Sequence, residues 1–436
     1  MLPWVRCAVT WAVAGVPWWL DFNSEESRLN LGNCVLVNAY SYHNAGDAAI
    51  MIASEQLMTD LGAESVVLSS RYADSDSYSS HGIRVVPEIL RFPARGDSGA
   101  ASRVATFLWA AARGALVVGA SKVSRKFGKF AARVLLPTSA RLLSDFETLV
   151  VAGGGYMYSS RRVFNMSLWH SLLTIRVAQA MLEGTVMMPQ SIGPVKRRID
   201  AFLIDWALRN TTVVVREKVS FSKSTVLPRV AVRAKEIHDV AFYLKDAPFD
   251  STQSAEARLV RVVVMDWRWS TSVREDAFAE YLRELARFID DLHENGYVVE
   301  VGGHSVIPEH AQDDVEIARL VASACTRPPV VDENCDVQHL LNRYRSSALV
   351  VGTRLHACIM SISQGTPAIA LAYQEKTTGV MAALGLGDFV FQADSLNADE
   401  LGNAVAHALS DESPDIKVLA RSIREKISSF YEEVIS

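Results

Sequence analysis

The chain has 436 residues, enough for two α/β units of about 200 residues each. Apolar residues make up 49% and charged residues 21%, which is ordinary globular usage and excludes a disordered or collagen-like chain. With 44 Lys and Arg against 49 Asp and Glu, the formal net charge of −5 gives no support to general nucleic-acid binding, so any anionic partner must be held by a local cluster.

The five cysteines are too few, and too irregularly spaced, for a disulfide framework or a structural zinc site. We therefore predict no metal centre and a reducing, cytoplasmic location. At the N-terminus, the apolar run from Cys7 to Leu20 is too short to span a bilayer. Pro17, Trp18 and Trp19 stand where a signal peptide needs small residues, so residues 1–30 are expected to form a short helix or an extension packed on the first domain.

From Leu31 onward, short apolar runs alternate with helical stretches. In the first half we predict strands over 34–38, 65–69, 148–152, 185–189 and 212–216, and helices over 47–61, 168–182 and 199–208. Uninterrupted apolar strands between helices are typical of parallel sheets that are covered on both faces.

An insertion over residues 72–134 interrupts this pattern and ends in a basic stretch. The apolar run 104–120 is followed by basic residues among Phe127, Phe130, Val134 and Leu135. Such an amphipathic pattern is typical of a helix that lies on an anionic membrane surface, and a solvated helix covering the core has the same pattern. We therefore expect a peripheral contact with the inner face of the membrane as one outcome.

The alternation restarts after a polar stretch from Asp246 to Glu256. There we predict strands over 259–265, 297–301, 348–351 and 368–372, and helices over 276–295, 313–324, 337–344, 356–363 and most of 398–435. The predicted fold is α/β, with an N-terminal Rossmann-like domain over 1–245 and a C-terminal one over 246–436. The two face a central cleft, because ligands of such sheets bind beyond the carboxyl ends of the strands.

The turn after the first predicted strand carries Asn44, Gly46 and Asp47. Gly46 permits a tight strand-to-helix turn, and Asp47 is a good N-cap for the following helix. Free N–H groups at such a helix start attract anions, although capping alone would explain the same residues. The turn is neither a GxGxxG loop nor a Walker A loop.

Two more strand ends carry candidate binding residues. Gly153, Gly154 and Gly155 follow the predicted strand 148–152, where glycines either let the backbone approach a ligand closely or form a flexible loop. Gln190 and Ser191 follow the next strand and begin a rigid turn.

Basic residues lie next to these strand ends. Lys196 and Arg197 form a cationic cluster after the turn, and Arg216 ends the following strand. A guanidinium in that position can grip a carboxylate or phosphate with two donors. A solvated helix start would explain the first two residues equally well, and an ion pair with Glu217 or another neighbour would explain Arg216.

The strongest candidate site is the turn that follows strand 348–351. Arg354, Leu355 and His356 stand at the start of a predicted helix, and Lys376 follows the next strand. Cations that converge on a helix N-terminus indicate an anion site, and the imidazole can move a proton near neutral pH. No HExxH or GxSxG motif occurs, and Cys358 is expected to lie inside the helix and face elsewhere.

These blocks resemble the polysaccharide pyruvyl transferase family. The resemblance covers residues 34–387 and rests on Asn44-Ala45-Gly46-Asp47, the three glycines, Gln190 to Pro194 with Arg216-Glu217, and Arg354-Leu355-His356 followed by Gly365-Thr366-Pro367 and Tyr373-Gln374-Glu375-Lys376. Two features depart from the family pattern: Glu217 stands where Asp is common, and the 72–134 insertion has no counterpart.

The resemblance implies a GT-B-like pair of Rossmann-like domains. It implies transfer of the enolpyruvyl group of phosphoenolpyruvate onto two sugar hydroxyls, giving a pyruvate ketal and phosphate. Arg354 and His356 would be catalytic, Lys376 would bind the donor, and a basic residue of the first half would complete the donor site. Leu355, between the two catalytic residues, is predicted to bind substrate. Phosphoenolpyruvate is then the donor substrate, no cofactor is expected, and the acceptor is a glycan or a lipid-linked oligosaccharide.

Two other functions stay open at this point. A GT-B glycosyltransferase would hold the diphosphate of a nucleotide-sugar at the same cations and would release a nucleoside diphosphate. A non-catalytic glycan-binding protein could retain the fold without the chemistry.

Overall fold

The computed structural model describes residues 30–70, 72–90, 100–159, 165–209, 211–217, 228–246, 258–268, 275–307 and 312–436. The expected N-terminal helix or extension lies outside the described residues, except for residue 30. The polar stretch predicted to separate the domains also lies outside them, apart from Asp246.

A parallel sheet with strand order β3-β2-β1-β4-β6 forms the centre of the N-terminal half. Its strands are β1 (Asn33–Val37), β2 (Ser65–Ser70), β3 (Arg84–Pro87), β4 (Thr148–Val151) and β6 (Gly184–Met187). Cys34 on β1 lies opposite Val66 on one side and Thr148 on the other. The central strands are buried along almost their whole length, which explains their continuous apolar sequence.

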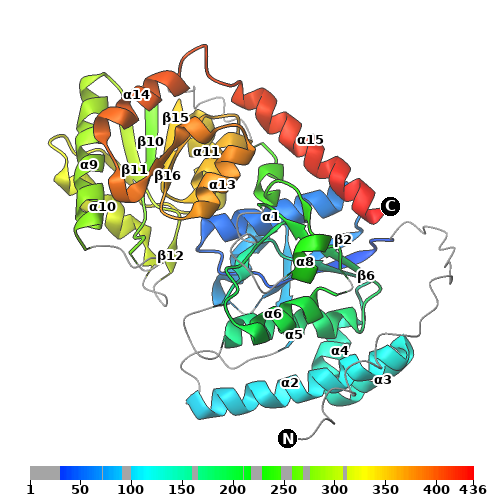
Figure 1. The fold of residues 1–436 in the computed structure, drawn as a ribbon. Coiled ribbons are helices and arrows are strands. Elements are labelled where there is room, and N and C mark those ends of the chain that lie inside the picture. The colour runs from blue at the N-terminus through cyan, green and yellow to red at the C-terminus, as the bar shows by residue number, and fades with distance from the viewer. Residues whose placement is uncertain are drawn as a thin grey trace, which may run out of the picture.

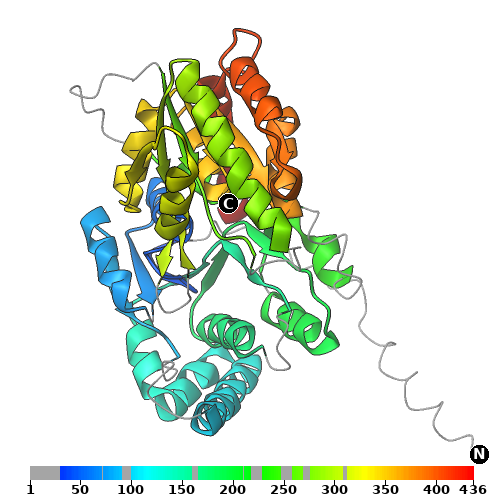
Figure 2. The same ribbon diagram turned by 90° about the vertical axis from the view of Figure 1, so that its left-hand side faces the viewer.

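Helices cover both faces of this sheet. They are α1 (Ala45–Asp60), α2 (Ala100–Val123), α3 (Arg125–Leu135), α4 (Pro137–Leu143), α5 (Met166–Gln179), α6 (Arg198–Ala207) and α8 (Pro228–Arg233), with short 3-10 turns η2 (Ala73–His81) and η3 (Val240–Tyr243). The described part of the insertion over 72–134 thus contains η2, β3, α2 and most of α3. Figures 1 and 2 show α2 and α3 as the outermost layer, on the far side of α5 from the sheet.

A second, smaller parallel sheet lies beside the first, with strand order β5-β7-β8-β9. Its strands are β5 (Gly154–Met157), β7 (Gln190–Ile192), β8 (Val214–Val215) and β9 (Lys235–Glu236). Gln190 and Ser191 lie in strand β7, so the prediction that a rigid turn begins at Gln190 is wrong. Gly154 and Gly155 lie in strand β5, so the alternative of a flexible loop is wrong for them. Gly154 lies opposite Gln190 in this sheet, because the chain continues past β4 and β6 into a new set of strand pairs.

The C-terminal half contains a six-stranded parallel sheet in the order β14-β11-β10-β15-β16-β17. The strands are β10 (Leu259–Val263), β11 (Val298–Gly302), β14 (Val330–Asp332), β15 (Leu349–Gly352), β16 (Ala368–Ala372) and β17 (Val390–Gln392). The helices are α9 (Glu275–Glu294), α10 (Asp314–Ala324), α11 (Val337–Ser346), α12 (Leu355–Ser363), α13 (Glu375–Ala383), α14 (Ala398–Ala408) and α15 (Ile416–Ile435). The short pair β12 (Val306–Ile307) and β13 (Gln312–Asp313) is antiparallel.

The predicted fold class, α/β with two Rossmann-like domains, is confirmed by these sheets. Among the described residues, every sheet consists of strands from one side of residue 246. Helix α15 nevertheless returns to the N-terminal half, as Figure 1 shows in red. The Tyr431 hydroxyl donates a hydrogen bond to the Met187 carbonyl at 2.7 Å, so the last helix is bonded to strand β6 of the first sheet.

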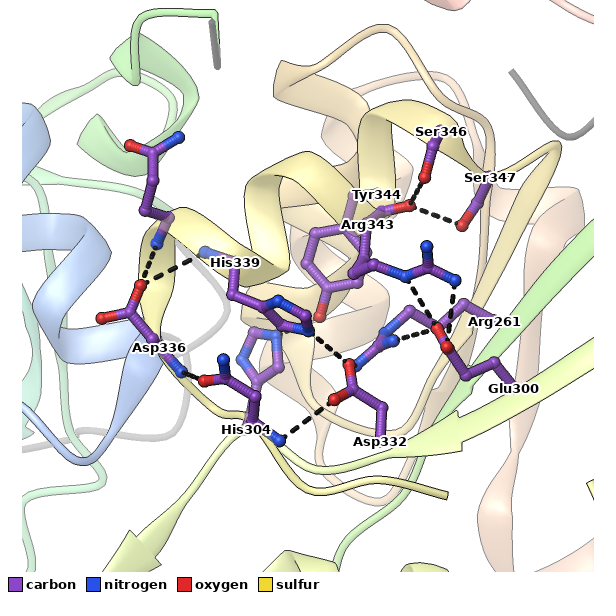
Figure 3. Close-up of polar contacts among 12 residues, drawn as sticks. Arg261, Glu300, His304, Asp332, Asp336, His339, Arg343, Tyr344, Ser346 and Ser347 are labelled. Atoms are coloured by element: carbon purple, nitrogen blue, oxygen red, sulfur yellow. Dashed lines mark hydrogen bonds and ion pairs between the residues drawn. The ribbon is translucent and has the colours of Figure 1, made fainter. Parts of the chain in front are cut away.

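A buried network of charges joins the strands of the C-terminal sheet behind its carboxyl edge (Figure 3). Arg261 on β10 is fully buried and pairs with Glu300 on β11 and with Asp332 at the end of β14. Arg343 on α11 donates two further hydrogen bonds to Glu300, at 3.1 and 2.9 Å. His339 Nε2 lies 2.7 Å from Asp332, so α11 is fixed to the same carboxylates.

Glu300→Ala should strongly destabilise the protein, because it leaves the buried Arg261 guanidinium with one carboxylate fewer. We expect a loss of about 3 kcal/mol in the free energy of unfolding, measured by urea denaturation. Glu333→Ala is the control, since Glu333 pairs with Arg319 at the surface and should matter little. Equal midpoints for the two variants would contradict the structural role of the network.

Candidate functional site

The two halves of the molecule meet at the start of α1. The backbone N–H of Ala45 donates to the His304 carbonyl at 2.9 Å, and Val306 N–H donates to the His43 carbonyl at 3.1 Å. Asn44 and Ser305 form an antiparallel bridge between these bonds. The start of α1 is thereby tied to the segment that follows β11.

The N-cap predicted at Asp47 is wrong. Helix α1 begins at Ala45, because the Asn44 carbonyl already accepts the first helical hydrogen bond, from Ala48 N–H at 2.9 Å. Asn44 holds the N-cap position, and its side chain makes no capping hydrogen bond. Asp47 stands in the first turn, where the helix dipole favours a carboxylate, while burial raises the pKa of Asp47.

Gly46 lies directly against the imidazole of His356. A Cβ atom at position 46 would lie 2.5 Å from Nδ1 of His356 and 2.8 Å from its Cβ. His356 is the second residue of α12, in the other half of the molecule. Only glycine at position 46 therefore leaves room for the His356 ring against the first turn of α1. The sequence predicted Gly46 for a tight turn, and the structure adds this contact as a stricter reason.

The other side of the His356 ring faces a buried carboxylate. Its Nε2 lies 3.7 Å from Oδ2 of Asp239, and the same carboxylate pairs with the Arg216 guanidinium. Arg216 Nε also donates to Ser191 Oγ at 2.7 Å. Burial by itself would raise the pKa of Asp239, but the positive charges of Arg216 and His356 hold it well below its usual range.

Arg354 is held by a second buried carboxylate. Its Nε and Nη2 donate to the two oxygens of Asp314 at 2.9 and 2.7 Å, a bidentate pair. Asp314 is the first residue of α10 and also accepts the His304 backbone N–H at 3.2 Å. Leu355, the first residue of α12, is buried and packs into the core.

Lys376 is the second residue of α13. Burial, together with the positive charges of Arg216 and Arg354, lowers its pKa from 10.5 to about 8, while Asp47 acts in the opposite direction. An anion bound beside it would restore the positive charge.

These side chains converge on Asp47. Its carboxyl group interacts electrostatically with His356, Lys376, Arg216 and Arg354, which come from three different strand ends and both halves of the molecule. The cluster combines four basic groups with the N-termini of α1, α12 and α13. It is suited to holding an anion and moving a proton beside it.

The glycines after β4 border the same cluster. A Cβ on Gly154 would lie 3.7 Å from Asp47 Oδ1, and one on Gly155 would lie 3.5 Å from Arg216 Nη2. Gly153 has a packing reason instead, because a Cβ there would lie 2.9 Å from the Pro189 carbonyl. Gln190 is fully buried and donates to the Ala152 carbonyl, so it supports this loop.

Lys196 and Arg197 have different surroundings. Lys196 is exposed, and its backbone N–H donates to Ser159 Oγ at 3.1 Å. The Arg197 guanidinium pairs with Asp200 at 2.9 Å at the start of α6. Of the three basic residues considered for the first half, the structure brings Arg216 to the cluster.

Sequence reasoning missed Asp239, Asp314 and His304. Asp239 caps η3, Asp314 follows another Asp at a helix start, and His304 lies in a turn after β11, so each had an ordinary local explanation. Burial, together with the charges of Arg354 and His356, holds the pKa of His304 well below its usual value. Cys358 faces the Gly352 and Ile369 carbonyls, and burial raises its pKa to about 12, so the thiol is not activated.

The sequence profile of the family described as polysaccharide pyruvyl transferase matches residues 44–375. The chain belongs to the polysaccharide pyruvyl transferase family. The matched range begins at Asn44 and includes Arg216, Arg354 and His356, and Lys376 follows it by one residue. It follows that the chain is an enzyme of polysaccharide pyruvylation and acts on a glycan.

Comparisons with individual proteins agree with this membership. The chain is 24% identical over 414 residues to the amylovoran biosynthesis protein AmsJ of Erwinia amylovora, covering 87% of this chain and 95% of that one. The fold is similar to UDP-GlcNAc 2-epimerase from Methanocaldococcus jannaschii (9% identity, TM-score 0.53, covering 92% and 99% of the chains). It is also similar to HepE from Anabaena, solved with UDP and glucose (12% identity, TM-score 0.52, covering 93% and 100%). This pyruvyl transferase family member therefore has a GT-B-like fold.

Gly46→Ala should displace the His356 ring and lower the turnover of pyruvyl transfer. A shift of about 1 Å in a reacting group can cost on the order of 10²-fold, and we expect a loss of that size. Gly402→Ala in α14 is the matched control, because a Cβ there meets no atom within 4 Å. Turnover rates measured side by side check this, and an active Gly46→Ala variant would contradict the placement of His356.

Binding of an anionic donor should weaken as the pH rises through about 8, because Lys376 is protonated below that pH and neutral above it. Calorimetric titration with phosphoenolpyruvate between pH 6.5 and 9.5 measures this. Lys376→Arg keeps its charge over that range and should flatten the profile. A wild-type affinity that stays constant over the whole range would exclude Lys376 from the donor site.

Proposed function

We propose that this enzyme transfers the enolpyruvyl group of phosphoenolpyruvate onto two hydroxyls of one sugar, in a polysaccharide or a lipid-linked glycan. The products are a cyclic pyruvate ketal and inorganic phosphate. The observation that carries the proposal is that four basic side chains from both halves, Arg216, Arg354, Lys376 and His356, all interact electrostatically with the Asp47 carboxyl group. Phosphoenolpyruvate carries a phosphate and a carboxylate, so it needs several cations and helix N–H groups at once.

In this proposal Arg354, Arg216 and Lys376 hold the two anionic groups of the donor. Nη1 of Arg354 is not used in the pair with Asp314, and Nη2 of Arg216 points towards Gly155. Both guanidiniums are fixed by buried carboxylates, so their positions are set before the donor binds. Such preorganised charge stabilises developing charge without reorganisation during the reaction.

His356 moves the proton. The first sugar hydroxyl adds to the central carbon of phosphoenolpyruvate while the methylene carbon gains a proton and becomes a methyl group. The second hydroxyl then bonds to the same carbon, the bond to the phosphate oxygen breaks, and the hydroxyl proton leaves with phosphate. The Asp239 carboxylate, 3.7 Å from Nε2 of His356, would face the positive charge that the ring gains when it takes up a proton.

No cofactor enters this scheme, and within the described part of the chain no group of three His, Cys, Asp or Glu residues could hold a metal ion. We also propose a cytoplasmic location. In its support, Cys34, Cys325, Cys335 and Cys358 are all free thiols.

Thermal unfolding with phosphoenolpyruvate, UDP-sugars and GDP-sugars tests the donor. We expect stabilisation by phosphoenolpyruvate alone, because a ligand that binds only the native state raises its stability. Arg354→Ala should abolish the shift, and Arg354→Lys, which keeps a charge next to Asp314, should restore part of it. Arg319→Ala, at the surface of α10, is the control. Stabilisation by a nucleotide-sugar alone would replace this proposal with glycosyl transfer.

His356→Ala should keep the shift with phosphoenolpyruvate and lose turnover by about 10²–10⁴-fold, the usual effect of removing an acid–base group. Phosphate release from phosphoenolpyruvate in the presence of a glycan acceptor measures this. Full turnover in His356→Ala would exclude the proton-transfer role.

A further inference from the structure

Helices α2 and α3 form a hairpin that packs on the molecule by one side only. Ser124 separates the two helices, which pack closely against each other. A Cβ on Gly128 of α3 would lie 2.6 Å from Cβ of Ser121 on α2. The inner side of α2 packs on α5, where a Cβ on Gly114 would lie 3.0 Å from Leu173. Figures 1 and 2 show the hairpin as the outermost layer of the N-terminal half.

The outer side of this hairpin exposes large apolar side chains, which we call the apolar face. Its members are 59% to 76% exposed and comprise Leu108, Trp109, Leu116 and Val123 on α2 and Phe127, Phe130 and Val134 on α3. On α3 their gaps of three and four residues place them on one side of the helix. On α2 Trp109, Leu116 and Val123 repeat every seven residues, and Leu108 lies next to Trp109. Large apolar patches on a protein surface usually mark an interaction site.

Positive charges border the apolar face. Lys126, Lys129 and Arg133 are exposed and have the same helical spacing along α3. Each directly precedes a member of the apolar face. Residues 100–143 contain eight Lys or Arg and no Asp or Glu, although the whole chain has a net charge of −5. Arg125 pairs with Glu183, outside this stretch, at 3.5 Å. Basic side chains beside exposed aromatic ones complement an anionic, amphipathic surface.

We propose that the apolar face of α2 and α3 docks on a lipid bilayer that contains anionic lipids. Phe127, Phe130 and Trp109 would enter the headgroup region, and the neighbouring lysines and arginines would meet lipid phosphates. Among the described residues no helix is both long and apolar enough to cross a membrane, so the hairpin lies along the surface. A second copy of the chain fits this face poorly, because a two-fold dimer would place the two basic helices against each other.

This proposal goes beyond the proposed function and does not depend on it. Docking needs neither the donor nor the acceptor, and none of the residues in the apolar face contacts the cluster around Asp47. If the acceptor is lipid-linked, docking would keep the enzyme at the surface that carries it.

Cosedimentation of the full chain with vesicles tests the proposal. We expect binding to vesicles of phosphatidylcholine mixed with phosphatidylglycerol, weaker binding to phosphatidylcholine alone, and a loss of binding as NaCl is added. The variant Lys126→Gln/Lys129→Gln/Arg133→Gln should bind the mixed vesicles on the order of 100-fold more weakly. Phe127→Ser/Phe130→Ser should weaken binding to both kinds of vesicle.

The matched control is Val330→Ser/Arg327→Gln, which removes an exposed apolar and an exposed basic residue from the C-terminal half. It should bind vesicles as the wild type does. All variants should keep the wild-type unfolding temperature, because the substituted side chains are exposed. Their stabilisation by phosphoenolpyruvate should equal that of the wild-type chain, so failure of docking and failure of the proposed function remain distinguishable.

Three outcomes would overturn the proposal. The wild-type chain could fail to bind either vesicle. Binding could persist in both sets of variants, which would assign it to another segment, such as the apolar N-terminal residues. The phenylalanine variant could change the oligomeric state in analytical ultracentrifugation and leave vesicle binding intact, which would make the face a protein interface.

Discussion

The backbone pairing of residues 43–45 with residues 304–306 sets the geometry of the whole site. It places the first turn of α1 against the segment after β11, and Gly46 then receives the His356 ring from the opposite half. Because this contact is between backbones, it holds the two halves at a fixed separation whatever the neighbouring side chains do. The convergence of four basic side chains near Asp47 follows from that separation.

Charge balance explains how so many cations can lie together in a buried place. Arg216 is paired with Asp239 and Arg354 with Asp314, and both carboxylates are nearly fully buried. These pairs orient the guanidiniums and reduce their mutual repulsion. Burial, together with the positive charges of Arg216 and Arg354, depresses the pKa of Lys376, while Asp47 and Glu217 act in the opposite direction. An anion bound beside Lys376 would favour its charged form.

The site also depends on elements far from it. The buried Arg261 network fixes α11 to β10, β11 and β14, and α11 carries Tyr344, whose hydroxyl contacts the His304 ring (Figure 3). The His304 carbonyl in turn accepts the hydrogen bond from Ala45 N–H, which joins the two halves. Helix α15 adds a second contact between the halves through the hydrogen bond of Tyr431. The α2–α3 hairpin takes no part in this framework, so its outer face is free to serve a different contact.

The sequence by itself determined the fold class, most helices and strands, and the family. Buried parallel strands have continuous apolar sequences, so they can be predicted from the sequence. Arg354, Leu355 and His356 are consecutive residues, so they stay neighbours in the folded chain. Tertiary structure decided which cation of the first half joins the site. Arg216, Lys196 and Arg197 look alike in sequence, and only the strand pairing of the small sheet brings Arg216 to Asp239. The requirement for glycine at 46, and the partnerships of Asp239 and Asp314, were likewise invisible, because each is made by residues from separate elements that meet only when the two halves pack together.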